Sequence, residues 1–204
     1  MCQAKDFPQN HVISHMNVSS WTPKTDIVNV HFMNTVIHVR DGNVDFVNCI
    51  FENISLSANS HHLHQINIRN CSSTGNRKPA MILIQNYRAL FFVGTKLRDV
   101  QSLKIQNVSE VFFIQCHITF SSQSLISISS SQYINVTQVK AKVTNNVQSP
   151  KMLHQQLVMA LNNINKVNID KASIISTTLQ LNKVSEFTIT HGIFYMSHIQ
   201  YVNV

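Results

Sequence analysis

Short stretches in which apolar and polar residues alternate recur along the chain at nearly constant spacing. The segment DFVNCIFENIS, residues 45–55, is followed by INIRNCSSTG, residues 66–75, which repeats its Asn-Cys pair 22 positions later. A weaker copy, VFFIQCHITF, occupies residues 111–120. Alternation with a period of two is typical of a strand with one buried side, so each copy predicts a short β-strand.

A pair of mostly apolar residues, separated by one position, precedes each Asn-Cys position and can be aligned through most of the chain. The aligned pairs are Thr25/Ile27, Val44/Phe46, Ile66/Ile68, Leu90/Phe92, Val111/Phe113, Ile134/Val136, Val167/Ile169 and Phe187/Ile189. From the second pair onward the steps are 20–24 residues, with one longer step of 33. Another alternating segment precedes each pair and a third follows it, so each unit contains three short strands.

Units of this kind predict a solenoid in which each repeat forms one coil. No helical period lies between the strands, which argues against a βαβ array. A series of hairpins needs turns such as Asn-Gly or Asp-Gly, and only Asp41-Gly42 fits. Residues 144–156 explain the long step as a loop inserted into one coil, and residues 1–24 are predicted to form an N-terminal cap or linker.

The phrases NVDFVNCIFEN and INIRNC resemble the degenerate coil repeat of the right-handed parallel β-helix family. That family includes pectate lyases, polygalacturonases, phage tailspikes and many non-enzymatic surface proteins. The resemblance covers residues 25–204 and implies an all-β fold, a single right-handed parallel β-helix of about eight coils with three short strands per coil. It says little about activity, because one fold carries many functions.

In the resembling family, the turn between the second and third strands favours Asn, which tolerates a left-handed backbone. The corresponding column here is Asn29, Asn48, Asn70, Gly94, Gln115, Gln138, Lys171 and His191. Cys49, Cys71 and Cys116 each follow a turn position, so we expect them to face inward as buried free thiols. A Cys49–Cys71 disulfide is the alternative, although the parallel Cβ vectors of stacked residues suit a bridge poorly.

The acidic residues give no catalytic pattern. A polysaccharide hydrolase needs two or three acids facing one cleft, and by this alignment the nine acids fall in no shared column. The outward positions of the first strand carry mainly amides and hydroxyls, so we predict no catalytic residue. The sequence HHLH, which contains His61, His62 and His64, has no carboxylate or Cys beside it, and we interpret it as a solvated loop. We predict no metal site and no cofactor.

Charge adds one candidate binding site. The chain has a net charge of +7, which favours anionic partners. On the third strand the outward positions place basic residues on three adjacent coils, at Lys96, Arg98, His117, Lys140 and Lys142. Such a grid suits the regular charges of an acidic polysaccharide, and the alternative is an ordinary solvated face. Nucleic acid is not predicted, because no aromatic residue lies between these charges.

Several features concern the setting of the chain and its partners. Phe91 and Phe112 share an outward column of the second strand and predict a covered patch. The final segment HIQYVNV resembles an uncapped coil, so we expect the chain to belong to a longer protein or to stack end to end. No signal peptide and no apolar run long enough to cross a membrane are present. Candidate glycosylation sites start at Asn17, Asn53, Asn70, Asn107 and Asn135.

These observations favour a non-catalytic extracellular or cell-surface module that binds a glycan or another surface protein. The alternative is a carbohydrate-active enzyme, a polysaccharide lyase or glycoside hydrolase, whose catalytic coils are divergent or lie outside this segment. A purely structural spacer is the third possibility. The extracellular setting follows from the resemblance alone.

Overall fold

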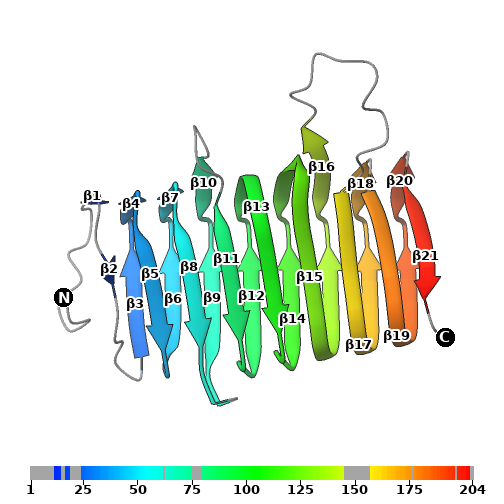
Figure 1. The fold of residues 1–204 in the computed structure, drawn as a ribbon, viewed down its shortest axis with the longest axis horizontal. Helices are drawn as coiled ribbons and strands as arrows, with labels where there is room; N and C mark the ends of the chain where they lie inside the picture. Colours follow the sequence, from blue (N-terminus) through cyan, green and yellow to red (C-terminus); the bar gives the residue numbers. More distant parts are fainter. Residues whose placement is uncertain are drawn as a thin grey trace.

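The computed structural model is a parallel β-solenoid of about seven turns, close to the number predicted from the repeat. Successive coils lie side by side along the long axis, from β1 at one end to β21 at the other (Figure 1). The structure describes residues 12–14, 17–18, 24–61, 63–74, 80–144, 157–175, 177–195 and 197–202. Within these residues the regular secondary structure is entirely β, and no helix able to cross a membrane occurs among them.

The strands stack into three faces, which we name by the order of the strands within a coil. The first face contains β2 (Asn17–Val18), β5 (Val36–Arg40), β8 (Ser55–Asn59), β11 (Met81–Gln85) and β21 (His198–Val202). The second face contains β3 (Lys24–Val28), β6 (Asn43–Val47), β9 (Gln65–Arg69), β12 (Ala89–Val93) and β14 (Glu110–Ile114). The third face contains β1 (Val12–Ser14), β4 (His31–Met33), β7 (Ile50–Glu52), β10 (Ser72–Thr74), β16 (Lys140–Thr144), β18 (Ser173–Ile175) and β20 (Ile193–Tyr195).

Four longer strands run from one face to the next. They are β13 (Lys96–Gln106), β15 (His117–Thr137), β17 (Leu157–Asp170) and β19 (Thr177–Thr190). The start of β13 pairs with β10 on the third face, and its end pairs with β11 on the first face. The bends between faces therefore occur within continuous strands in this half of the molecule.

The register of the second face confirms the alignment made from the sequence. Val44 pairs with Ile66, and Phe46 pairs with Ile68, as the repeat predicts. The same register continues through every later pair of the alignment. Alternate residues are buried along strands such as β5, β6 and β8, because a period of two places every second side chain inside the solenoid, whereas every residue of β21 in the last coil is exposed.

The predicted turn column is also confirmed. All eight of its residues have a positive φ between 51° and 60°, from Asn29 to His191. Left-handed residues also mark two turn columns that the sequence did not predict. One contains Asn34 and Asn53, and the other contains Asp41, Asn86, Asn107, Ser130, Asn163 and Lys183. Asn side chains link adjacent coils in these columns, where Asn107 donates to Asn86 at 2.8 Å and Asn53 donates to Asn34 at 3.1 Å.

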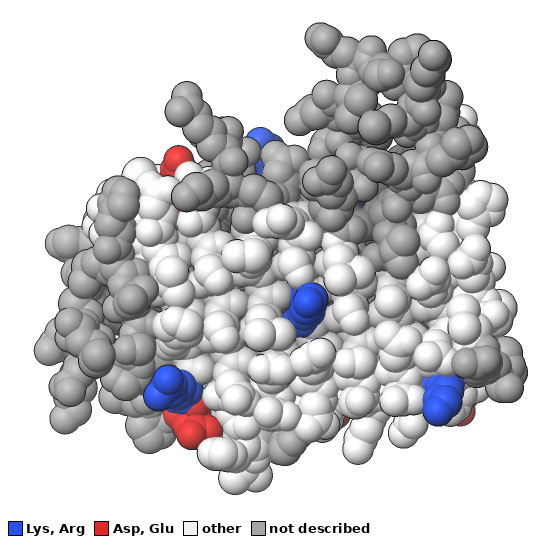
Figure 2. All heavy atoms as spheres, viewed as in Figure 1, with Lys and Arg blue, Asp and Glu red and all other residues white. Residues whose placement is uncertain are grey.

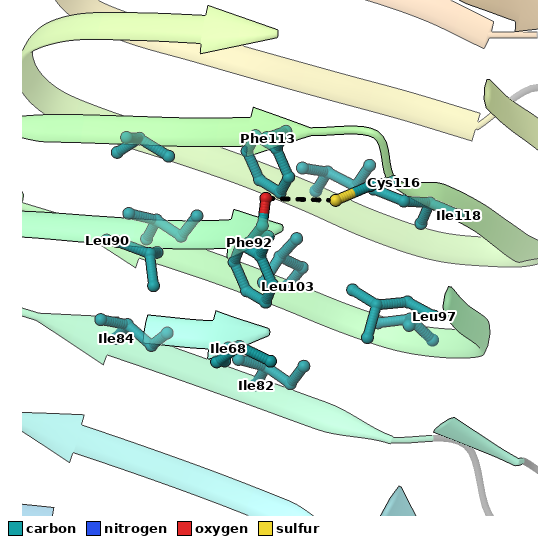
Figure 3. Packing of buried hydrophobic residues seen from close by; sticks show 14 of the residues in the cluster. Ile68, Ile82, Ile84, Leu90, Phe92, Leu97, Leu103, Phe113, Cys116 and Ile118 are labelled. Atoms are coloured by element: carbon teal, nitrogen blue, oxygen red, sulfur yellow. Dashed lines mark hydrogen bonds between the residues drawn. The ribbon is translucent and has the colours of Figure 1, made fainter. Parts of the chain in front are cut away.

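The interior is an apolar core that runs through the coils (Figure 3). Near the N-terminal end, the ring of Phe46 lies 6.2 Å from that of Phe32 and 5.6 Å from that of Phe51. Further along, the rings of Phe92 and Phe113 stack at 5.0 Å between centroids. Between β13 and β18 the core contains a cavity of about 40 Å³ lined only by apolar side chains.

The cysteines of the repeat are free and buried, so the expected thiols are confirmed and the alternative disulfide is not formed. Each thiol donates to a carbonyl of the preceding coil, as Cys116 does to Phe92 at 3.3 Å (Figure 3). Thr95 occupies the same column and donates to Ile68 at 2.8 Å. Burial raises the pKa of the Cys116 thiol, and the pKa of Cys71 is raised by its hydrogen bond with Cys49 and by burial. These thiols therefore act as small core groups with a weak donor.

Two segments of the predicted domain layout fall partly outside the described residues. Residues 145–156 of the predicted loop are among those not described, and residue 144 is the last residue of β16. Within the predicted N-terminal cap or linker, β1 pairs with β4 and β2 pairs with β5.

Candidate functional site

The third face brings the predicted basic residues together. Lys96 pairs in register with His117, and His117 pairs with Lys140. Side chains in register on adjacent parallel strands are spaced by about 4.8 Å, so these three form one outward column across three coils. Their side chains are all exposed. We name Lys96, Arg98, His117, Lys140 and Lys142 the basic cluster.

The second column of the cluster is less regular than the alignment suggested. Lys142 pairs in register with Thr119, as predicted, but the pairing of β13 with β15 shifts after Leu97. Arg98 lies in this bulge, where its N–H donates to the Ser73 hydroxyl at 2.7 Å and its carbonyl accepts from the same hydroxyl at 3.0 Å. A bulge re-aims side chains, and Ser73 anchors the backbone at this point. Thr119 is only 7% exposed.

The members of the basic cluster are close enough to interact electrostatically. The pKa of His117 is lowered by partial burial and by the charges of Lys142, Lys140, Arg98 and Lys96. None of the five forms an ion pair with an acid whose side chain the structure describes. Elsewhere, by contrast, Arg69 pairs with Asp45, and Lys166 pairs with Glu186 at 2.8 Å. A group of neighbouring cations without an acid partner has a net attraction for anions.

The first face carries few charges, as expected from the sequence. Its outward positions form amide columns, in which Gln85 donates to Gln106 at 2.6 Å and Asn182 donates to Asn162 at 3.3 Å. In the view of Figure 2, Lys and Arg are isolated on the described surface of one broad side of the molecule.

The expectation that no two acids share a column was wrong. Asp26 pairs in register with Asp45 on the outer side of the second face. The alignment of Thr25/Ile27 with Val44/Phe46 contains this signal, because the residue between the members of each pair is Asp. Asp45 accepts from Asn67 and forms the ion pair with Arg69, so one carboxylate of the two is already engaged. Paired acid–base catalysis needs two available carboxyl groups, and this column does not supply them.

The sequence also suggested that no carboxylate lies beside the His61–His64 segment. The structure places Asp41 Oδ2 3.3 Å from His61 Nε2, and the Ser60 hydroxyl 2.7 Å from His64 Nδ1. His62 lies outside the described residues. Asp41 comes from a turn of the preceding coil, and this contact has no signal in the local sequence. The described residues contain no group of three metal-binding side chains, here or elsewhere.

The outward phenylalanines of the second face stack on each other. The rings of Phe91 and Phe112 are 4.6 Å apart and nearly parallel, and Tyr133 meets Phe112 edge-on at 5.8 Å. Both phenylalanines are half-buried. Because the two ring faces cover each other, the patch presents mostly ring edges to solvent.

The candidate glycosylation sites occupy different settings. Asn53, Asn70 and Asn107 are turn residues with positive φ, whereas Asn135 lies within β15 and accepts from Asn168 at 3.2 Å. Asn17 lies in β2. Glycosylation at each of them stays a prediction.

The last coil exposes apolar side chains. Tyr195 and Tyr201 are each 62% exposed, and Ile193 is 65% exposed. Stacking of another chain or coil on this end stays a prediction.

No protein-family model matches the chain, and no curated protein and no solved structure matches it. The likeness to other proteins therefore rests on the β-solenoid architecture, which leaves activity open.

Proposed function

We propose that this protein is a non-catalytic β-helix module that binds an acidic polysaccharide through the basic cluster of the third face. The observation that carries the proposal is the geometry of the cluster, in which Lys96, His117 and Lys140 form one exposed column in register on three adjacent coils. Like charges held together are unfavourable in the free protein. An anionic ligand relieves that repulsion, so its binding is favoured beyond the contacts themselves.

Two further features support a non-enzymatic role. The first face presents amide columns, and the acid pair of the second face has Asp45 engaged by Arg69. The described residues thus offer no arrangement of an available acid and base around a cleft. The pectate lyase-like branch, the extracellular setting and membership of a larger surface protein follow from the resemblance of the repeat and belong to the same proposal.

The test compares retention on a dextran sulfate matrix for two variants with equal changes in net charge. The first variant replaces Lys96, Arg98, Lys140 and Lys142 by Glu. The control replaces four exposed cations outside the cluster, Arg40, Arg88, Lys104 and Lys183, by Glu. We expect the first variant to lose at least about tenfold in affinity, since several weak ion contacts are lost together and replaced by repulsion. The control should lose much less.

Equal losses in both variants would mean that net charge alone causes retention, and the proposed site would be wrong. Incubation with acidic and neutral polysaccharides, followed by measurement of chain length, separates binding from catalysis. Unchanged chain length agrees with a binding module. Shortening of any polymer would favour the carbohydrate-active enzyme instead.

A further inference from the structure

The outward column that runs through the basic cluster extends beyond it in both directions. Ser72 precedes Lys96 in register, and Ser173 follows Lys140. The next residues in the column are Ile50 and Ile193, both exposed. A polar track is therefore bounded by an apolar residue at each end. Four steps of about 4.8 Å give this track a length of about 19 Å.

The charges are arranged along the solenoid axis more than along the strands. The column crosses three coils and has a cationic or titratable group on each, whereas a single strand offers two at most, such as Lys140 and Lys142. A linear polyanion that lies along the axis meets one such group every 4.8 Å or so. The same polymer lying along a strand leaves the cations of the other coils unused.

His117 is the central member of the column. Among the side chains that the structure describes, the charged groups of the neighbouring strands that face it are Lys96 and Arg98 from β13 and Lys140 and Lys142 from β16. Its own strand places Thr119 two residues further on. Asp99 follows Arg98 in the bulge of β13. Every cation that surrounds His117 opposes its protonation in the free protein.

We propose that the acidic polysaccharide lies along the solenoid axis over the track from Ser72 to Ser173, and that His117 strengthens its binding as the pH falls. This inference rests on the proposed function. The sign follows from linkage. Ligand anions favour the imidazolium form, so the complex holds more proton at His117 than the free protein does. Affinity therefore rises as the pH falls through the interval between the pKa in the complex and the lower pKa in the free protein.

The experiment measures the dissociation constant of fluorescently labelled dextran sulfate at pH 8, 7, 6 and 5, because sulfate groups keep their charge over this range. Three variants are compared with the wild type: His117→Gln, His117→Lys and His31→Gln. His31 lies in the same outward column, beyond Ile50, and pairs with Glu52 at 3.2 Å. It is therefore a matched histidine outside the track, and neutral dextran is the ligand control.

All variants gain affinity at low pH, because the chain has 11 histidines that add positive charge. Between pH 8 and pH 5, the affinity of the wild type and of His31→Gln should rise about two- to fivefold more than that of His117→Gln. A factor of this size corresponds to one additional exposed ion contact. His117→Lys should bind tightly already at pH 8 and gain no more than His117→Gln. Equal gains in the wild type and His117→Gln would overturn the role of His117 while leaving the binding site intact. Absence of wild-type binding at every pH would instead contradict the proposed function.

Orientation is tested with single variants and with ligand length. Lys96→Gln and Lys140→Gln should weaken binding by similar factors, about two- to fivefold each, since an axial ligand meets both. Affinity should rise with oligosaccharide length until the ligand spans the track of about 19 Å, and then level off. A loss confined to Lys140→Gln and Lys142→Gln, with Lys96→Gln unaffected, would place the ligand along β16 and overturn the axial arrangement.

Discussion

The coils near β6 and the coils near β16 share one register but fill the interior differently. In the first region, Phe46 lies within 5.6–6.2 Å of the rings of Phe32 and Phe51, and the core is occupied by aromatic side chains. In the second region, the core is mainly aliphatic and contains the cavity of about 40 Å³. On the second face the strands keep the same register through both regions.

The two regions also differ in the residues that occupy the left-handed turn between the second and third faces. Asn29, Asn48 and Asn70 occupy the left-handed turn in the first region, whereas Gln138 and Lys171 occupy it in the second. Asn tolerates this conformation better than a longer side chain does. The difference teaches that alternation and backbone pairing are sufficient to set the register. The packing of the core and the identity of the turn residue then change the stability of each region. The basic cluster lies on the second region, whose core contains the cavity.

The largest expected effect is the loss of an aromatic ring from the first region. Phe46→Ala should reduce the free energy of unfolding by about 3–5 kcal/mol, because it removes the ring that contacts both Phe32 and Phe51. Phe113→Ala should fall at the lower end of that range, since its ring lines the cavity and stacks on one aromatic ring, that of Phe92. Urea unfolding at pH 7 measures both. A greater loss for Phe113→Ala would contradict the difference in packing.

Replacing one buried Ala by Val should change the free energy of unfolding in opposite directions in the two regions. Ala141 lines the cavity, and Ala141→Val should raise the free energy of unfolding by about 0.5–2 kcal/mol by filling it. Ala58 is fully buried in β8, away from the cavity lining, and Ala58→Val should lower the same quantity by about 1–3 kcal/mol through overpacking. Thermal unfolding followed by circular dichroism gives the comparison. Destabilisation by both substitutions would show that the cavity does not accept added volume.

Much of this architecture is predictable from the sequence, because alternation alone identifies the inward residues. Val44 and Phe46 align with Ile66 and Ile68 by pattern, and the structure pairs them in that register. The turn column is predictable because Asn recurs in it, and the repeat then assigns Lys171 to it, although Lys by itself signals no turn.

Features that depend on three-dimensional detail were not predictable. The bulge at Arg98 shifts the pairing by one residue, and its trace in the sequence is a single break in the alternation, where the inward residues Leu97 and Val100 are three positions apart. The contact of Asp41 with His61 joins two turns whose conformations are set by the coils around them. The basic cluster itself was found from register, since the charges become neighbours only when coils are stacked.

Exchange of the turn residues between the two regions should stabilise the second region and destabilise the first. Lys171→Asn should raise the free energy of unfolding by up to about 1 kcal/mol, because Asn accepts the φ of 51° at lower cost than Lys. Asn48→Lys should lower it by about 1 kcal/mol at a φ of 54°. Both residues are exposed, so changes in core packing are small. Chemical denaturation of the two variants and of the double exchange measures the effect, and a gain from Asn48→Lys would contradict the argument.

The smallest effect concerns the thiols of the inward column, which connect the two regions. Burial raises the pKa of Cys116, so the folded protein keeps the thiol protonated while the unfolded chain ionises near its ordinary pKa of about 8.5. This stabilisation is complete below that value and is lost as the pH rises above it. Between pH 8 and pH 9 the wild type should therefore lose up to about 0.7 kcal/mol more than Cys116→Thr.

Thr is the appropriate replacement because Thr95, in the same column, donates to a carbonyl of the preceding coil as Cys116 does. The substitution keeps a donor and removes the ionisable group. Unfolding measured in parallel at pH 8 and pH 9 isolates the contribution of Cys116, since Cys71 is present in both proteins. An equal loss for the two proteins would mean that the Cys116 thiol ionises as readily in the folded state as in the unfolded chain. The column would then be open to solvent at this coil, and the continuity of the core from one region to the other would have to be rejected.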